Sequence, residues 1–242
     1  MAAHPVAAAQ RDHGEPKTMS TAGKLLSSTE IASIEHAIGE AEKTTAAEIV
    51  PVIATASGRY DRGEDLFGLV FACVTLVGAW FAVPGKIDLA WSATSSPGLG
   101  IALSVAIVVG GFVIGAALAT RITALRLPFI AREEMLEEVE RRAIETFQRQ
   151  RIRSTSRATG VLIYVSLYER IVKVLGDDNA AVQLPPAALE EICALVIDGL
   201  KQGNPATGLE SAIRKTGELL APHLPATPDD TNELANRLIL ID

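Results

Sequence analysis

Two long apolar runs constrain this chain more than any other feature of its sequence. They occupy residues 66–83 (LFGLVFACVTLVGAWFAV) and 99–119 (LGIALSVAIVVGGFVIGAALA), and neither contains a charged residue. An α-helix rises 1.5 Å per residue, so about 20 apolar residues cross a hydrocarbon layer of roughly 30 Å. The runs therefore predict a transmembrane hairpin with spans 66–83 and 99–119. The alternative is a pair of buried core helices, but core helices of this length normally carry a polar face.

The sequence outside the hairpin is typical of water-soluble protein. We expect residues 28–58 and 126–223 to be two parts of one domain that the hairpin (66–119) interrupts. Residues 1–27 have no periodic apolar pattern and predict a disordered tail, and residues 224–242 predict a C-terminal tail. Residues 1–20 contain no continuous apolar stretch typical of a signal peptide. The net charge of -7 gives no support to nucleic-acid binding.

Basic residues next to the runs predict the orientation of the hairpin. Five arginines flank it, at positions 59, 62, 121, 126 and 132, whereas Lys86 is the one basic residue in the link between the runs. Cytoplasmic flanks carry an excess of Lys and Arg. We therefore expect both termini to be cytoplasmic.

Small residues in the second run predict close helix packing. Gly111 and Gly115 are four residues apart and Ala119 follows one turn later, a spacing that lets helices approach each other. Two alternatives stay open: packing between the two spans, or a homodimer formed through Gly111 and Gly115. The runs contain no Asp, Glu, Lys, Arg or His, which disfavours a transport path.

Periodicity in the flanking sequence predicts a mixed sheet with helices on both faces. Apolar residues at helical spacing predict four helices, over residues 29–43, 128–151, from 185 to about 199, and 206–220. Strands are predicted at 48–54, 160–167 and 170–175, the first at a sheet edge or bulge because Pro51 lacks an N–H group. A long crossover should make the first two strands parallel, and a tight turn should make the last two antiparallel. The fold class expected is α/β, a small α/β/α sandwich.

This topology would bring acidic residues to one end of the sheet. Glu48 begins the first strand, and Asp177, Asp178 and Asn179 follow the third. Oxygen ligands of this kind suit Ca²⁺ or Mg²⁺. The alternative is that GDDNA is an ordinary turn and Glu48 a solvated strand end.

The loop before the second strand should lie at the same end. It carries Arg153, Ser154 and Arg157, which could face a phosphate because guanidinium groups pair well with phosphoryl oxygens. No Walker loop, G-x-G-x-x-G, G-x-S-x-G, C-x-x-C or H-E-x-x-H pattern is present to indicate another chemistry.

Three segments resemble a known family. They are TAAEIVPVIA, TGVLIYVSLYERIVKVLGDDNA and the tail PDDTNELANRLI. Together they resemble the TPM domain, and most closely a bacterial group of membrane proteins in which a two-span hairpin splits that domain. The resemblance covers residues 28–54 and 132–239.

The resemblance implies two functions. The first is an interaction or assembly-support module in the bacterial inner (plasma) membrane, working with a membrane-protein partner. The alternative is a metal-dependent phosphatase, because some TPM domains are acid phosphatases with divalent-metal sites.

Overall fold

The computed structural model describes residues 7–8, 21–82, 97–122, 125, 127–155, 157–227 and 232–242. Two compact units make up the chain. The first combines Met1–Gly58 with Met135–Asp242, and the second is Arg59–Glu134. Residues 59–134 are therefore inserted between the two parts of the first unit.

The first unit is built on a five-stranded mixed sheet with the order β1-β4-β3-β2-β5. The strands are β1 (Ala7–Ala8), β2 (Ile49–Ala54), β3 (Val161–Ser166), β4 (Ile171–Gly176) and β5 (Ile239–Ile241). β2 and β3 are parallel, and β3 and β4 are antiparallel. This arrangement confirms the predicted α/β fold and its strand directions.

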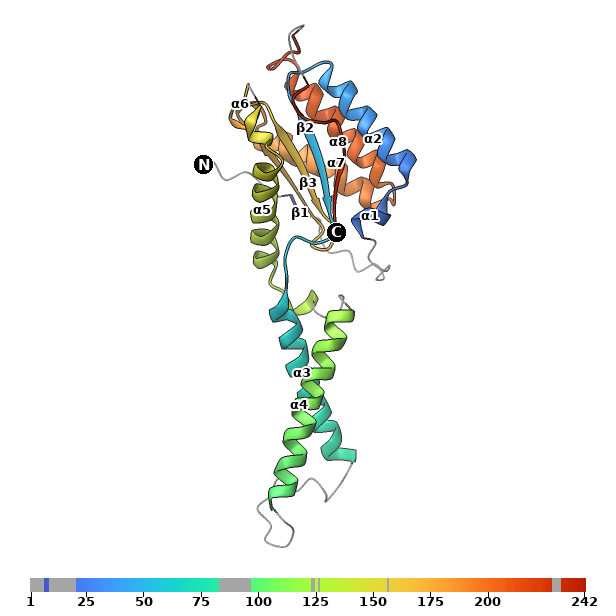
Figure 1. Ribbon diagram of the computed structural model, residues 1–242, viewed down its shortest axis with the longest axis vertical. Coiled ribbons are helices and arrows are strands. Elements are labelled where there is room, and N and C mark those ends of the chain that lie inside the picture. The colour runs from blue at the N-terminus through green and yellow to red at the C-terminus, as the bar shows by residue number, and fades with distance from the viewer. Residues whose placement is uncertain are drawn as a thin grey trace. The chain divides into compact units, whose positions relative to one another are not determined.

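Helices cover both faces of this sheet (Figure 1). They are α1 (Ala22–Leu25), α2 (Ser28–Glu42), α5 (Arg132–Arg149), α6 (Asp178–Gln183), α7 (Pro186–Lys201) and α8 (Pro205–Leu220). α2, α7 and α8 lie on one face and α5 lies on the other (Figure 1). The larger core lies under α2, α7 and α8, where Ile34, Ile163 and Ile192 are fully buried. On the other face α5 buries a stripe at helical spacing that includes Val139 and Ala143.

Parts of both predicted tails belong to the fold, which corrects two of the expected boundaries. α1 lies within residues 1–27, and its Ala22 is fully buried. A helix of four residues is too short to leave a periodic pattern in the sequence. β5 lies within residues 224–242 and pairs in parallel with Val52–Ala54 of β2. Its apolar residues are preceded by the polar run PDDTNEL, which hides the strand from a sequence-based reading.

Pro51 is tolerated in β2 because β5 pairs with β2 only from Val52 onward. β2 lies between β3 and β5, but its pairing with β5 starts at Val52. Backbone groups alternate in direction along a strand. Thr55 donates its N–H to Ile241 of β5 at 2.8 Å, so the nitrogen of Pro51 faces the same side, where no strand residue lies opposite. At Pro51, β2 therefore has a strand on one side only, as predicted for a sheet edge. From Val52 onward β2 is an interior strand between β3 and β5.

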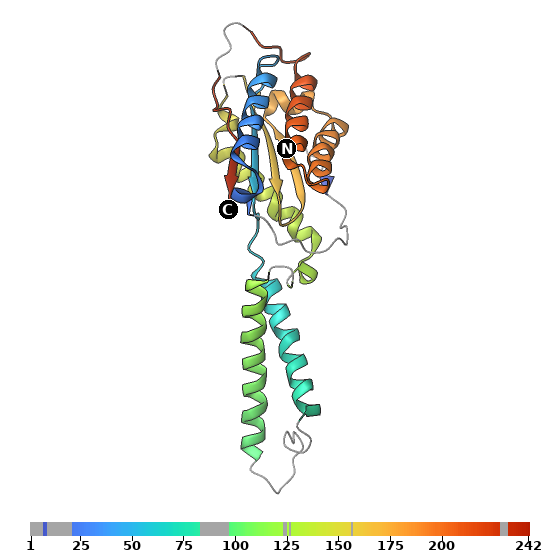
Figure 2. The same cartoon turned by 90° about the vertical axis from the view of Figure 1, so that its right-hand side faces the viewer.

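The second unit is a helical hairpin. α3 (Asp61–Ala82) and α4 (Pro97–Arg121) run side by side (Figure 2), followed by a short 3-10 helix at Leu127–Phe129. Arg62–Ala82 and Ile101–Arg121 are long and apolar enough to cross a membrane. Val83, at the end of the first predicted span, lies outside the described residues.

Small residues form the contact between α3 and α4. A Cβ on Gly115 would lie 3.0 Å from the Cα of Gly68, and a Cβ on Gly111 would lie 3.0 Å from the Cα of Ala72. Thr120 adds a hydrogen bond from its hydroxyl to the Glu64 carboxylate at 2.8 Å. The structure thus uses Gly111 and Gly115 for packing between the two spans, and a homodimer through them stays a prediction.

Candidate functional site

The residues predicted to form a site come together at one end of the sheet in the first unit. The N–H of Val161 donates to the carbonyl of Glu48 at 2.8 Å, and the N–H of Asp177 donates to the carbonyl of Gly160 at 2.8 Å. The amide N–H of Asn179 reaches the carbonyl of Ala158 at 3.0 Å. These bonds align the start of β2, the loop before β3 and the residues after β4.

The Glu48 side chain binds the C-terminal segment. Its carboxylate accepts the backbone N–H groups of Glu233 at 3.1 Å and Leu234 at 3.2 Å. Glu48 is only 9% exposed, so these donors compensate for burying its carboxylate. We call residues 232–242 the C-terminal strap. It continues into β5 and ends at Asp242, whose side chain accepts the hydroxyl of Thr55 at 2.8 Å.

Asp177 has a different local role. Its Oδ1 accepts the N–H of Asp178 at 2.9 Å at the N-terminus of α6. Its Oδ2 is buried and has no hydrogen-bond partner among the described residues. Asp178 is exposed, and the Asn179 side chain donates to the carbonyl of Arg157 at 2.5 Å.

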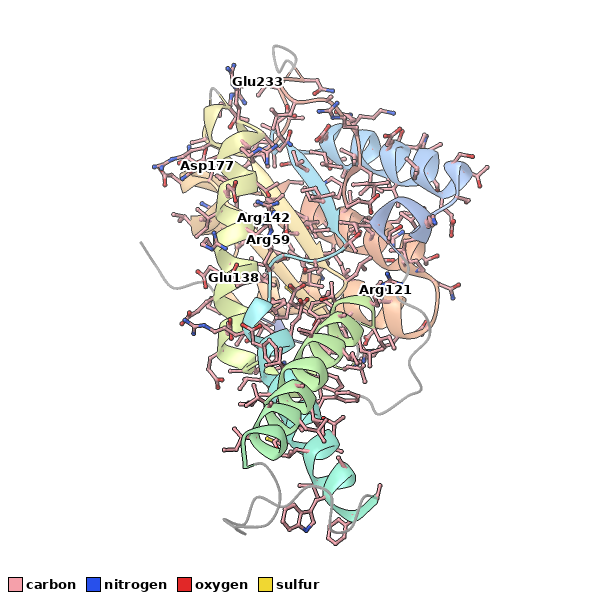
Figure 3. The ribbon with its side chains drawn as sticks, turned by 60° about the horizontal axis from the view of Figure 1, so that its bottom comes forward. Arg59, Arg121, Glu138, Arg142, Asp177 and Glu233 are labelled. Atoms are coloured by element: carbon pink, nitrogen blue, oxygen red, sulfur yellow. The ribbon has the colours of Figure 1, made fainter. Side chains whose placement is uncertain are left out.

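The predicted cation ligands thus have separate partners. The described residues contain no group of three or more His, Cys, Asp or Glu side chains that could hold a metal ion. The Ca²⁺ or Mg²⁺ site at Glu48, Asp177, Asp178 and Asn179 stays a prediction. Figure 3 shows Asp177 and Glu233 among the side chains of the chain.

The predicted phosphate-binding residues lie in the loop that joins α5 to β3. Arg153 and Arg157 are exposed, and Arg157 donates to the Thr227 hydroxyl at 2.9 Å. The backbone of Ser154 ends a 3-10 turn, Ile152–Ser154, whereas its side chain lies outside the described residues. Thr159 fixes the end of the loop by donating its hydroxyl to the carbonyl of Ala46 at 2.7 Å.

A carboxyl pocket at this end of the sheet was missed by sequence reasoning. The cavity has a volume of about 200 Å³, and its lining includes Glu42, Glu48, Asn232 and Asn236. Burial raises the pKa of Glu42 to about 8; the N–H of Ile49, which donates to this carboxyl at 3.0 Å, opposes the rise. The neighbouring Glu48 raises the pKa of Glu42 further, and the Asn236 side chain lowers it.

Glu42 can hold a proton near neutral pH, because burial disfavours its charged form and the neighbouring Glu48 carboxylate adds to this effect. A sequence signal did exist. Glu42 lies in the last turn of the predicted helix 29–43, six residues before Glu48, and both asparagines lie in the segment PDDTNELANRLI. The sequence does not show that the C-terminal strap passes beside the start of β2.

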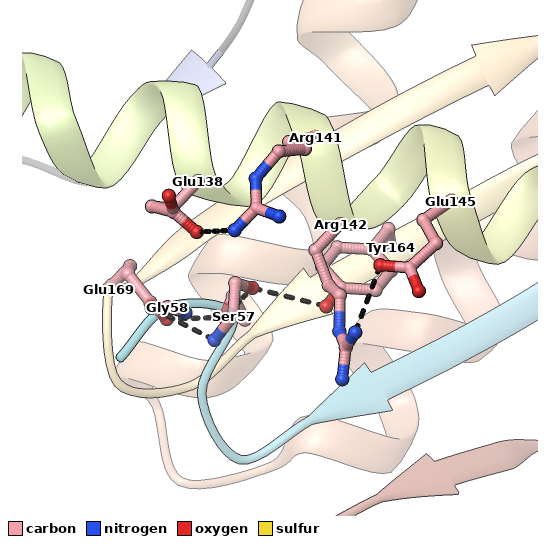
Figure 4. A network of polar contacts seen from close by, with 9 residues as sticks. Ser57, Gly58, Glu138, Arg141, Arg142, Glu145, Tyr164 and Glu169 are labelled. Atoms are coloured by element: carbon pink, nitrogen blue, oxygen red, sulfur yellow. Dashed lines mark hydrogen bonds and ion pairs between the residues drawn. The ribbon is translucent and has the colours of Figure 1, made fainter. Parts of the chain in front are cut away.

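A second polar cluster lies where β2 and β3 end (Figure 4). Buried Glu169 accepts the backbone N–H groups of Ser57 at 2.9 Å and Gly58 at 3.2 Å, and also binds the Ser166 hydroxyl. The Ser57 hydroxyl also lies 3.1 Å from the Tyr164 hydroxyl. Burial is the main cause of the raised pKa of Tyr164. The bonds from Ser57 and Gly58 to Glu169 fix the backbone of the segment that precedes α3.

Residues 128–219 match the TPM domain family. The matched residues run from before α5 to the last turn of α8 and include β3, β4 and the arginine-bearing loop. The match supports the resemblance seen in the sequence, without testing the membrane group within it.

A solved structure has a fold similar to that of this chain. It is the NMR structure of the BA42 protein from the psychrophilic bacterium Bizionia argentinensis, with 20% identity and a TM-score of 0.51. The alignment covers 88% of this chain and 94% of that one. No curated protein matches the chain.

Proposed function

We propose that this protein is a membrane-anchored binding module. The α3–α4 hairpin inserts in the bacterial plasma membrane with both termini in the cytoplasm, and the TPM domain engages a membrane-protein partner. One observation carries the anchoring. Large apolar residues on both helices lie away from the helix contact, such as Val74, which is 62% exposed, and Val113, which is 59% exposed. An apolar surface of this extent is costly in water and stable in lipid.

Charge substitutions on the hairpin test the anchoring. Val74→Glu combined with Val113→Glu should abolish carbonate-resistant membrane association of the full chain. A charged group in the bilayer core costs about 2.5–3.5 kcal/mol on insertion scales. Val182→Glu is the matched control, because Val182 is 78% exposed on α6 in the other unit. Recovery of the unmodified chain in the soluble fraction would contradict the anchor.

A reporter fused after Asp242 tests the orientation. A reporter that is active only in the cytoplasm should give signal. Activity of a reporter that works only outside the membrane would contradict cytoplasmic termini.

Crosslinking in membranes tests the binding role. We expect a specific membrane-protein partner to be recovered with the full chain. A control protein keeps residues 59–134 and replaces the TPM domain by an unrelated one. If this control recovers the same partner, the hairpin binds the partner and the TPM domain does not.

A metal-dependent phosphatase is the second candidate function. The observation that favours it is the buried Asp177 Oδ2, which has no donor among the described residues. A buried carboxylate oxygen without a donor is unfavourable, and a bound Ca²⁺ or Mg²⁺ would satisfy it.

Phosphomonoester turnover by the full chain decides between the two functions. Turnover that requires Mg²⁺ or Ca²⁺ and disappears in Asp177→Asn would support the phosphatase. Absence of turnover, together with unchanged metal binding in Asp177→Asn by calorimetry, would leave the binding module.

A further inference from the structure

A groove with charged walls lies between α2 and α8 of the first unit, with a volume of about 480 Å³. Glu210, Arg214 and Glu218 line it from α8. They are four residues apart, so they form one stripe on the helix with the charges negative, positive and negative. We call these three residues the α8 stripe. On the α2 side of the groove, Glu40 is paired with Lys43, which leaves the α8 stripe as the main charge pattern.

α5 carries the opposite charge pattern on the other face of the sheet (Figure 1). Arg141, Glu145 and Arg149 are also four residues apart, with the charges positive, negative and positive, and we call them the α5 stripe. Arg141 and Arg149 are exposed, and 44% of the Glu145 side chain is exposed. Eight residues of an α-helix span about 12 Å, so the two stripes have the same length. The half-buried Ile144 lies beside the α5 stripe, and Ala37 lines the groove, so each surface also offers apolar contact.

Two of the six stripe charges have no local partner. Among the described residues, Glu210 and Arg149 form no ion pair. Arg214 and Glu218 lie 4.0 Å apart, and their side chains are 71% and 62% exposed. Water screens an ion pair at such positions, so it holds its members only weakly. All of these charges are therefore available to a partner.

The remaining charges of the α5 stripe have neighbours on their own helix. Arg141 binds Glu138, and Glu145 accepts a hydrogen bond from Arg142 at 2.9 Å. Each pair joins residues one turn apart on the surface of α5. Such pairs stabilise a helix little, so they can be exchanged for pairs with another molecule.

The two stripes are in register when copies of the chain lie side by side. The carbonyl of Leu224, just after α8, accepts the N–H of Ala46, just before β2, at 2.8 Å. The carbonyl of Ile152, just after α5, lies against Gly160, just before β3. Both helices therefore end at the end of the sheet where β2 and β3 begin. Copies that share one orientation in a bilayer would pair Arg141 with Glu210, Glu145 with Arg214 and Arg149 with Glu218.

We propose that a second copy of this chain places its α5 stripe in the groove beside the α8 stripe. Each charge of one stripe then meets an opposite charge of the other, which stabilises the contact and fixes its register. The two surfaces differ, so the contact is heterologous and repeats from copy to copy in a row or a closed ring. This self-association goes beyond the proposed function, in which the partner is a different protein.

Energy transfer between full-length chains tests the contact. Donor and acceptor fluorescent proteins are fused after Asp242 in separate samples of the chain, and the two are mixed in phosphatidylcholine vesicles. Excess unlabelled chain gives the background. The α8-reversed variant exchanges the signs of one stripe (Glu210→Lys, Arg214→Glu, Glu218→Lys). The α5-reversed variant does the same for the other stripe (Arg141→Glu, Glu145→Lys, Arg149→Glu).

Loss and recovery of energy transfer are the expected results. Transfer should be several-fold weaker in each reversed variant by itself, because equal charges then face each other. An equimolar mixture of the two variants should regain it, and so should a chain with both reversals, because opposite charges meet again. The chain with both reversals keeps the net charge of -7, so the total charge does not explain the recovery.

Four results would overturn the contact. They are no transfer in the unmodified chain, equal transfer in the reversed variants, loss without recovery in a folded chain with both reversals, and transfer that salt does not change. Raising the salt from about 0.1 M to about 1 M shortens the screening length from about 10 Å to about 3 Å. Transfer in the unmodified chain should then fall several-fold, which decides the matter if the variants do not fold. None of these results affects crosslinking to a different membrane protein, so failure here is distinguishable from failure of the proposed function.

Discussion

Replacing Glu48 by alanine should release the C-terminal strap from the sheet. The Glu48 carboxylate accepts two backbone N–H groups of the strap, those of Glu233 and Leu234. Alanine leaves both donors without this acceptor. The other ties of the strap remain, including β5 pairing and the bond between Asp242 and Thr55. The change should therefore act on local opening of the strap more than on global unfolding.

The structure sets the size of this effect. A hydrogen bond to a charged group contributes about 1.5–3 kcal/mol. The two bonds of Glu48 are 3.1 and 3.2 Å long, so each belongs at the weaker end, and removing Glu48 also relieves its repulsion of Glu42. We expect the opening free energy of the strap to fall by about 2–3 kcal/mol, which speeds amide exchange about 30- to 150-fold.

Hydrogen–deuterium exchange of the full chain in detergent micelles measures this effect. Amides of residues 232–241 should exchange faster in Glu48→Ala, while β3 amides keep their protection. Glu48→Gln retains one acceptor oxygen and should give a smaller increase. Glu190→Ala, on the exposed side of α7, is the matched control. Unchanged exchange of the strap in Glu48→Ala would refute the reasoning.

Three further predictions follow from single side chains. The pKa of Glu42 is raised from 4.5 to about 8, so its stabilising proton is present at low pH and is lost as pH rises through 8. The urea midpoint should therefore fall between about pH 5 and 9, and it should depend less on pH in Glu42→Gln. The same pH dependence in both proteins would contradict this role of Glu42. Gly160→Ala should lower the free energy of unfolding by about 1–3 kcal/mol, because its Cβ would overlap the carbonyl group of Ile152; an unchanged free energy of unfolding would disprove this close approach. Gly111→Leu should destabilise the hairpin in SDS titrations because it meets α3, whereas Gly110→Leu faces open space and should not; loss of a dimer with an intact hairpin would favour the homodimer instead.

Local patterns predicted most of the fold. β3 is nearly all apolar and follows a glycine, and such a run predicts an interior strand whatever surrounds it. The crossover between β2 and β3 made their parallel pairing predictable from chain order alone. β5 was missed because three residues carry too little pattern, and its pairing with β2 joins segments almost 190 residues apart.

The candidate site was predictable in position but not in its contacts. Chain order brings Glu48 and Asp177 to the same end of the sheet, which the sequence foretold. The partner of Glu48 is instead the strap, and Asp177 begins a short helix that leaves no periodic signal. Glu42 became part of the pocket only through the same return of the chain.

The sequence by itself determined that the chain has two charge-free apolar runs within an α/β domain, because composition and periodicity are local properties. Only the tertiary structure decided which residues of α4 contact α3. Gly111 and Gly115 lie against α3, and the bulky apolar residues are exposed. It also decided that the C-terminal strap closes the start of β2. Both outcomes depend on the backbone hydrogen bonds and close approaches of residues distant in the chain, which no local pattern encodes.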